Sequence, residues 1–369
     1  MIHFFVDRMG SQGINTYLAG HGRPLAGAVI PMDYEELAGR SQIAAGGAIF
    51  AAVDQLSPAE CTLAQAVCER LTDTGHKVLN QPVRVRNRYD LLQLLHAEKV
   101  NRFKAVRATA PYDELRYPVF IREEHQHTGA KSPLLADAFA VERALAMLAL
   151  RGRPRHRLLI VEFCDTRGRD GLYRKYSAFR VSGRILPRHV HVSAQWVSKS
   201  PTSLTNDETV REEARYFETN PHEAWLRQIF ELANIEYGRI DYGLANGELQ
   251  VWEINTNPTL GRNPRRAPRP GSEAFRPLTE PFRAEFHRVF QDAILALDSP
   301  ASPVDLPIVV STDVHRRLAT EHRTRQRRRR CDAFARKVIA LAAVQRLRGI
   351  LDPLIASLTR QIARRRIAR

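Results

Sequence analysis

The sequence predicts an α/β protein, and three observations support that fold class. Short apolar segments typical of strands, such as residues 3–6 and 158–161, alternate with longer segments that carry helix start and stop signals. The chain has 369 residues, of which 44% are hydrophobic, so it can form two or three lobes with a substantial core. Residues 239–257 contain two strand-like segments around a Gly-containing turn.

Residues 1–98 are expected to form an N-terminal α/β lobe. A helix should begin after Ser57, because Ser57, Pro58 and Glu60 have the spacing of an N-cap, a first-turn proline and a capping-box glutamate. Gly75 should end this helix. The other elements expected in this lobe are strands at 3–6 and 77–80 and a helix at 89–99.

Two further lobes are expected, at 99–163 and 164–298. The elements predicted for the first are a strand at 117–122, a loop at 123–132, a helix at 134–151 and a strand at 158–161. The elements predicted for the second are strands at 173–181 and 185–193, a helix opened by Asn220, the hairpin, a Pro- and Arg-rich loop at 261–277 and a helix at 282–297.

The hairpin carries a set of oxygen ligands. Side chains alternate along a strand, so Arg239 and Asp241 share one face of the first strand, and Glu253 and Asn255 share one face of the second. If the two faces coincide, two carboxylates and an amide oxygen meet, a set that suits Mg²⁺ bound with nucleotide phosphates. Solvated acidic residues on a hairpin are the alternative.

The length of the turn decides whether the faces coincide. A two-residue turn at 246–247 would leave Glu253 on the far face, whereas a three-residue loop at 245–247 pairs Glu253 with Arg239. We predict the three-residue loop, because a type I turn followed by a residue with positive φ favours glycine at its last position, where Gly247 stands.

These residues resemble the metal-binding end of the ATP-grasp superfamily, which has an acidic residue on one strand and a Glu-x-Asn pair on the next. The Arg-x-Asp and Glu-x-Asn-x-x-Pro patterns are most similar to those of D-alanine:D-alanine ligases, and the resemblance extends over about residues 79–261. It implies that an ATP-grasp fold follows the N-terminal lobe along the chain, with a lid lobe at 99–163 and a metal- and substrate-binding lobe at 164–298.

The resemblance also implies roles for the hairpin residues. Asp241, Glu253 and Asn255 would hold Mg²⁺, and Arg239 would neutralise a developing oxyanion. The cofactors implied are ATP and Mg²⁺.

Five residues outside the hairpin are candidates for nucleotide binding. Glu162 and Asp165 follow a buried strand, where backbone groups can meet an adenine edge and Asp165 can take ribose hydroxyls; a solvated strand end is the alternative. Arg122 stands where the superfamily commonly has lysine, and it can hold phosphate through two donors. Lys104 and Lys175 are further candidates, although an isolated lysine is more often a solvated surface charge.

Histidines near these segments have open roles. His125 and His127 lie in residues 124–132, the loop of the expected lid lobe, which we call the lid loop. This loop contains a single glycine, and the two histidines could contact substrate or a second metal ion. His189 and His191 share one strand face, and we favour a wall of the active site for them over catalysis.

The resemblance implies an ATP- and Mg²⁺-dependent ligase that joins a small-molecule carboxylate to an amine through an acyl phosphate. Two alternatives stay open. One is a phosphotransferase acting on a hydroxyl, and the other is a non-catalytic binding protein targeted by its basic tail.

The positive charge is concentrated in the tail. Of a net charge of +16, residues 311–369 contribute +13, and the first 310 residues contribute +3. Residues 299–369 are expected to be a linker and a basic amphipathic helical tail, with its apolar stripe in 331–367. The tail could contact an anionic membrane surface or nucleic acid, or pack on the main body or a second subunit of a homo-oligomer.

Cysteine use and the start of the chain favour a cytoplasmic protein, with membrane-surface association as an alternative. The four cysteines form no CxxC pair and are expected to be reduced, and the chain starts without a signal-like segment.

Overall fold

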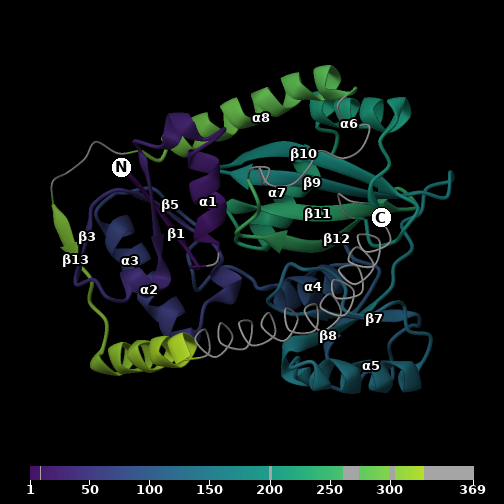
Figure 1. The fold of residues 1–369 in the computed structure, drawn as a ribbon, viewed down its shortest axis with the longest axis horizontal. Helices are drawn as coiled ribbons and strands as arrows, with labels where there is room; N and C mark the ends of the chain where they lie inside the picture. Colours follow the sequence, from purple (N-terminus) through teal and green to yellow (C-terminus); the bar gives the residue numbers. More distant parts are fainter. Residues whose placement is uncertain (9, 199–201, 261–273, 299–303, 328–369) are drawn as a thin grey trace, which may run out of the picture. The chain divides into compact units, whose positions relative to one another are not determined.

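A computed structural model describes residues 1–8, 10–198, 202–260, 274–298 and 304–327 (Figure 1). The chain divides into two compact units, Met1–Val310 and Ser311–Arg369. The predicted tail helix at 331–367 and most of the predicted loop at 261–277 lie outside the described residues. The α/β class expected from the sequence is confirmed, while the four-part division into lobes stays a prediction.

The N-terminal part of the first unit contains a parallel sheet in the order β2-β1-β4-β5. Helix α3 (Pro58–Asp73) begins as predicted, because the Ser57 side chain accepts from the Glu60 backbone and the Glu60 side chain accepts from the Ser57 backbone. The other elements here are β1 (Ile2–Val6), α1 (Ser11–Leu18), β2 (Val29–Asp33), α2 (Tyr34–Leu37), β4 (Gly47–Phe50), β5 (Val78–Leu79) and three-residue 3₁₀ helices at 23–25 and 53–55.

A two-stranded antiparallel sheet joins β3 (Gln42–Ala44) to β13 (Asp305–Pro307). Residues 305–307 lie within 299–369, which was expected to contain only a linker and a helical tail, so this strand was not predicted. A three-residue strand has too few residues to show the alternating pattern that identifies strands in a sequence.

A second sheet has the order β6-β8-β7 and is antiparallel. Its apolar face packs on α5, which starts four residues later than predicted because Asp137 caps it. The elements are α4 (Arg88–Ala97), β6 (Ala105–Arg107), β7 (Val119–Glu123), α5 (Ala138–Leu150), a 3₁₀ helix at 155–157 and β8 (Leu158–Glu162).

The third sheet is antiparallel, has the order β10-β9-β11-β12 and carries the hairpin. Alternation buries one face, including Tyr176 and Ile240, in an apolar cluster with Phe230 of α7. The opposite face carries the polar Lys175 and Ser177 along one part of β9 and buries Phe179 and Val181 in a second apolar cluster farther along the strand. The elements are β9 (Tyr173–Val181), β10 (Arg184–Ser193), α6 (Asp207–Thr219), α7 (Glu223–Leu232), β11 (Tyr237–Ala245), β12 (Glu248–Asn255) and α8 (Arg276–Leu295).

Asn220 has a different role from the one predicted. It was expected to cap the start of a helix, but it ends α6 with a φ of 40° in the left-handed region, and α7 begins at Glu223 without a side-chain cap. Asn is among the residues that adopt this conformation at helix ends, so the same residue type is compatible with either end of a helix.

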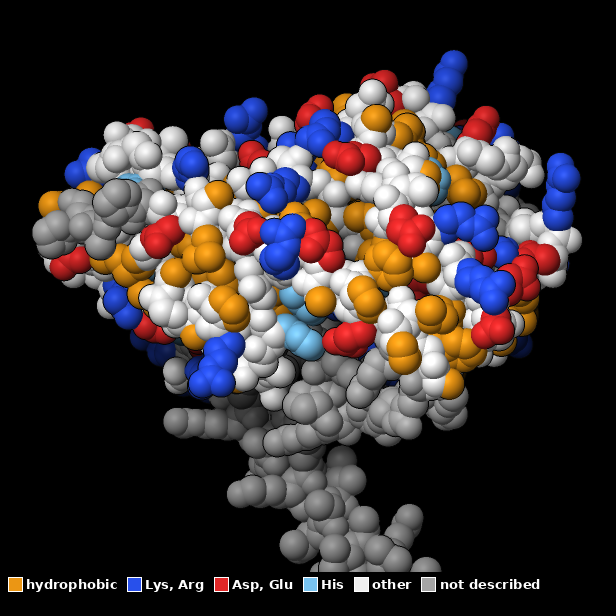
Figure 2. All heavy atoms as spheres, turned by 90° about the horizontal axis from the view of Figure 1, so that it is seen from above, with side chains coloured by type: hydrophobic (Ala, Val, Ile, Leu, Met, Phe, Trp, Pro, Cys, Tyr) orange, Lys and Arg blue, Asp and Glu red, His pale blue; other side chains and the backbone are white. Residues whose placement is uncertain are grey.

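The surface of the described residues has mixed charge on the face drawn in Figure 2, where Lys and Arg side chains are interspersed with Asp and Glu. This agrees with the small net charge of the first 310 residues. Among the described helices, none combines the length and the apolar composition needed to cross a membrane.

Candidate active site

The turn of the hairpin differs from the prediction. Ala245 pairs with Glu248, so the turn has two residues, Asn246 and Gly247, with φ angles of 54° and 83°. Two consecutive positive φ angles at Asn-Gly are typical of a type I′ turn, whose twist matches that of the strands. The predicted three-residue loop is wrong, and so is the pairing of Arg239 with Glu253.

A β-bulge nevertheless brings the carboxylates to one face. Tyr242 pairs with Val251 and Asp241 pairs with Glu253, so Trp252 is an extra residue on β12. One extra residue in the strand, like one extra residue in the turn, changes which side chains of the two strands share a face. Asp241 and Glu253 therefore lie directly opposite each other, and Arg239 lies opposite Asn255.

A cavity of about 410 Å³ opens beside this face, between the second and third sheets. Residues of the lid loop and of the segment 196–198 complete its wall. The predicted site residues that line it are Arg122, Glu162, Lys175, Arg239, Asp241 and Glu253. Lys104, Asp165 and Asn255 are not among the residues that line it.

Asp241 is 4% exposed and has three partners. Its carboxylate accepts hydrogen bonds from Ser177 Oγ at 2.5 Å, Lys175 Nζ at 3.0 Å and Arg239 Nε at 3.0 Å. Burial alone would raise the pKa of Asp241, but Arg239 and Lys175 favour the charged form and lower the pKa to about 2. Asp241 is therefore ionised at neutral pH.

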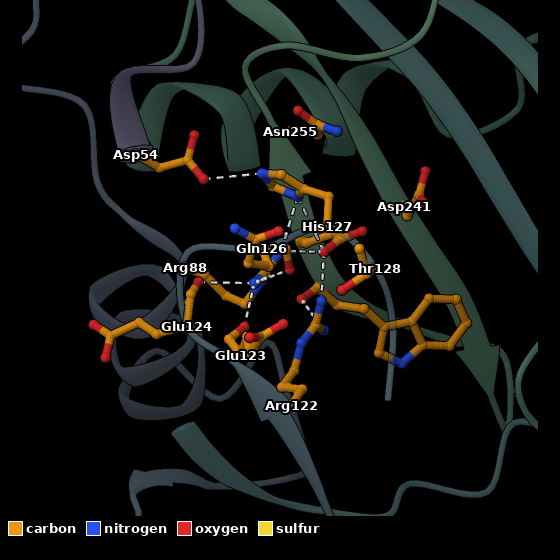
Figure 3. A network of polar contacts seen from close by, with 12 residues as sticks. Asp54, Arg88, Arg122, Glu123, Glu124, Gln126, His127, Thr128, Asp241 and Asn255 are labelled. Atoms are coloured by element: carbon orange, nitrogen blue, oxygen red, sulfur yellow. Dashed lines mark hydrogen bonds and ion pairs between the residues drawn. The ribbon is translucent and has the colours of Figure 1, made fainter. Parts of the chain in front are cut away.

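Glu253 is held by cations from the lid side of the cavity. Its carboxylate accepts from Arg88 Nη2 and Arg122 Nη2, both at 2.5 Å, and His127 Nδ1 lies 3.4 Å away. Burial opposes ionisation, but Arg88 and Arg122 hold the pKa of Glu253 well below its usual range. Figure 3 shows Arg88, Arg122 and His127 in one polar network.

Arg88 was not predicted, although it is central to this network. Its guanidinium also donates to the carbonyls of Glu123, Glu124 and Gln126 at 2.7, 2.7 and 2.9 Å, so it fixes the start of the lid loop. In the sequence, Arg88 is one charged residue at the start of a helix, and its partners are 35 or more positions away. We see no local signal that could have identified it.

His127 connects the lid loop to the N-terminal sheet. Its Nε2 lies 2.9 Å from Asp54 Oδ2 (Figure 3). Asp54 Oδ1 accepts from Thr256 Oγ1 at 3.1 Å. Burial would lower the pKa of His127, but hydrogen bonds with Asp54 and Glu253 raise it above its ordinary value. His127 lines the cavity, whereas its loop neighbour His125 is exposed.

The remaining nucleotide candidates have different environments. Glu162 is buried and accepts from the backbone N–H groups of Lys104 and Arg116 at 2.9 and 2.7 Å and from the Arg116 guanidinium at 2.8 Å. The side chain of Lys104 is exposed and lies 4.0 Å from Glu114. Asp165 is exposed and makes an ion pair with Arg167 at 2.5 Å. Lys104 and Asp165 do not line the cavity, so their roles in nucleotide binding stay predictions.

Aromatic side chains gather along the cavity wall. The ring centroids of Phe120 and Phe163 lie 5.0 and 5.8 Å from that of Trp196. This wall suits a planar heterocycle, and the cations Arg122, Lys175 and Arg239 suit phosphates. The aromatic residues that line the cavity are Phe103, Phe120, Phe163, Tyr173, Trp196 and Trp252.

The donor set on the hairpin is suitable for Mg²⁺ only together with an anion. No group of three or more His, Cys, Asp or Glu in the described part of the chain could hold a metal ion alone. Asp241 and Glu253 are ionised and opposite each other, and Asn255 Oδ1, although it accepts from the Asn257 backbone at 2.8 Å, retains a lone pair. Mg²⁺ takes few protein ligands and completes its octahedron with water and phosphate.

Comparisons with known proteins give structural similarities. No protein-family model and no curated protein matches the chain. A D-alanine–D-alanine ligase from Bacillus anthracis, in complex with ATP, is 12% identical, with 79% of this chain and 98% of the ligase covered and a TM-score of 0.42. A RimK domain ATP-grasp protein from Sphaerobacter thermophilus is 16% identical, with 80% and 99% covered and a TM-score of 0.42.

The ATP-grasp ligase PsnB in complex with a minimal precursor is a third similar structure, at 13% identity, with 80% of this chain and 99% of PsnB covered and a TM-score of 0.45.

Proposed function

We propose that this chain is an ATP- and Mg²⁺-dependent ligase that joins a carboxylate to an amine. One observation carries the proposal: the ionised Asp241 and Glu253 face each other among cations at one end of an aromatic-lined cavity. Arg122, Lys175 and Arg239 in the cavity wall, with the buried Arg88 beside Glu253, outnumber these two carboxylates, so the site favours a polyanion. ATP with its metal ion has this chemistry.

The reaction that fits this site has two steps. A substrate carboxylate oxygen attacks the γ-phosphorus of ATP and ADP leaves, which gives an acyl phosphate. An amine nitrogen then attacks the carbonyl carbon, phosphate leaves and the nitrogen loses a proton. Both steps build negative charge on oxygen, and fixed cations in a partly dry site stabilise such charge.

The residues are assigned as follows. Arg122 and Lys175 bind the phosphates of ATP, and Arg239 stabilises the oxyanion formed when the amine attacks. Asp241, Glu253 and Asn255 would hold Mg²⁺, which spreads the charge of the transferred phosphoryl group. Glu162, through the backbone groups of Lys104 and Arg116, fixes the strand end against which the base would stack.

The test is to incubate the full chain with ATP, Mg²⁺ and a metabolite extract. We expect ADP, free phosphate and a new amide detectable by mass spectrometry. Asp241→Asn and Glu253→Gln should each lower the rate at least a hundredfold, because each removes a charge on which the metal ion depends. A phosphorylated metabolite formed without free phosphate would instead indicate a phosphotransferase. Unchanged rates in both variants would contradict the assigned site.

A further inference from the structure

Arg188 lies in a second β-bulge, on β10. Pro187 pairs with Ala178 and His189 pairs with Ser177, so Arg188 is the extra residue on its strand. A bulge redirects the side chain of the extra residue. Here the guanidinium stacks on the Phe286 ring of α8, with its carbon 4.6 Å from the ring centroid.

The charge of Arg188 has no close counter-charge in the described part of the chain. Its Nη2 donates to the Leu260 carbonyl at 3.3 Å, and no described carboxylate lies within ion-pair distance. The nearest cations, Arg239 and Arg283, repel it, and Glu213 attracts it only at longer range. Burial first, and then these arginines, lower the pKa of Arg188 to about 10.

A largely desolvated arginine without a counter-charge destabilises the folded chain unless an anion binds beside it. Desolvation of a charge is compensated only by a well-placed opposite charge, and Arg188 has none among its described neighbours. The residue is nevertheless partly exposed, so its surroundings leave access for a small molecule. A planar guanidinium with most of its donors unused suits a carboxylate or a phosphate.

His189 supplies a second polar group at the same place. Its Nε2 is buried and makes no hydrogen bond, and its ring stacks on that of His191 with centroids 4.1 Å apart. An imidazole nitrogen without a partner in a buried position is destabilising for the same reason as the unpaired arginine. His189 and Arg188 are consecutive, so both incomplete groups belong to one short segment of β10.

The position of this segment relates it to the proposed reaction. His189, Ser177, Asp241 and Glu253 form one row across β10, β9, β11 and β12. With neighbouring strands about 4.8 Å apart, His189 is roughly 10 Å from Asp241. In the strand order, this segment lies on the β10 side of Asp241, whereas Glu253 lies on the β12 side.

We propose that Arg188 and His189 bind an anionic group of the acceptor substrate, so that the acceptor carries a second carboxylate or a phosphate besides the carboxylate that reacts. This substrate class rests on the proposed ligase function. Such an acceptor would extend from Arg188 to the ATP phosphates proposed to bind beside Asp241. A molecule with a few carbon atoms between its two anionic groups covers this distance.

The test measures binding by isothermal titration calorimetry on the full chain. The probes are glutarate and phenyl phosphate, which carry two charges, and pentanoate, which matches glutarate in carbon number with one charge. We expect at least one dianion to bind ten times more tightly than pentanoate. Arg188→Met should weaken that binding at least tenfold, and a preference between the two dianions identifies the second group as carboxylate or phosphate.

A matched control comes from the next strand. Arg180 on β9 is partly exposed, and burial lowers its pKa. Unlike Arg188, it has two acidic residues, Glu231 and Glu236, whose charges favour its charged form. Arg180→Met should change dianion binding less than twofold. His189→Gln serves as a second probe of the site, with an expected loss of at least threefold, and it keeps the test decisive if Arg188→Met does not fold.

The proposal is wrong if neither dianion binds more tightly than pentanoate, or if the Arg188 and His189 variants behave like Arg180→Met. A separate titration with Mg·ADP reports on the proposed function. Failure of Mg·ADP to bind the unmodified chain counts against the ligase, whereas loss of dianion selectivity with normal Mg·ADP binding counts only against the anion subsite.

Discussion

At the scale of single residues, the environment of Glu253 decides what the site can do. Two buried arginines, Arg88 and Arg122, donate to this carboxylate. Burial and the neighbouring Arg88 lower the pKa of Arg122 to about 10, which leaves it charged at neutral pH. Under the proposed function, the charge that would bind phosphate is thus present before a nucleotide arrives, which lowers the reorganisation needed on binding.

His127 gives this cluster a dependence on pH. Its pKa is raised in the folded chain, so its contribution to stability is fully present below its ordinary pKa of 6.5 and is lost as the pH rises through the raised value. We expect the melting temperature of the unmodified chain to fall more steeply between pH 6 and pH 9 than that of His127→Gln. Calorimetric melts without nucleotide provide the measurement. Parallel pH profiles of the two proteins would show that the ion pair of His127 with Asp54 contributes nothing.

At the scale of elements, the sequence was informative wherever the signal was local. The strands around Ser182-Gly183 and the start of α3 agree with the prediction, because turn glycines and capping residues act on their own neighbours. The hairpin shows the limit. Its common face was predicted correctly for the wrong reason, since Trp252 supplies in the strand the extra residue that was assigned to the turn.

The residues that sequence reasoning missed share a physical cause. Arg88 and Asp54 act on groups that are 35 to 202 positions away, and no spacing along the chain encodes such contacts. The Trp252 bulge depends on how β12 meets β11 and leaves no composition signal. Asp165, whose predicted role stays a prediction, is not among the residues that line the cavity and pairs with Arg167.

The capping box of α3 allows a test at this scale. Ser57→Ala removes the acceptor for the Glu60 backbone N–H, which lies 3.2 Å from Ser57 Oγ. We expect a loss of about 1 kcal/mol in the free energy of unfolding, measured by urea denaturation. Thr62→Ala in the same helix, whose hydroxyl bonds only the Pro58 carbonyl at 3.0 Å, should change stability by less than about 0.5 kcal/mol. Equal losses in the two variants would contradict a specific role for the cap.

At the scale of the first unit, the site depends on how the parallel sheet joins the hairpin sheet. The fully buried Asn80 follows β5, and its side chain donates to the carbonyls of Phe50 and Tyr237 at 3.0 and 2.7 Å. Its Oδ1 accepts from the backbone N–H groups of Glu236 and Tyr237 at 2.9 and 3.0 Å. One amide therefore connects the end of β4 to the start of β11, the strand that carries Arg239 and Asp241.

Replacing Asn80 tests whether this amide holds the two sheets together. Asn80→Ala removes the side-chain partner of four backbone groups, and we expect a loss of about 3 kcal/mol or more in unfolding free energy, together with weaker Mg·nucleotide binding. Asn80 has a φ of 64°, so part of the loss in the alanine variant comes from backbone strain. Asn80→Gly removes the same hydrogen bonds without that strain, and it should remain within about 1 kcal/mol of Asn80→Ala. If Asn80→Gly is as stable as the unmodified chain and binds nucleotide equally well, then only the backbone conformation at position 80 matters. The position of β11 would then not depend on the side-chain amide.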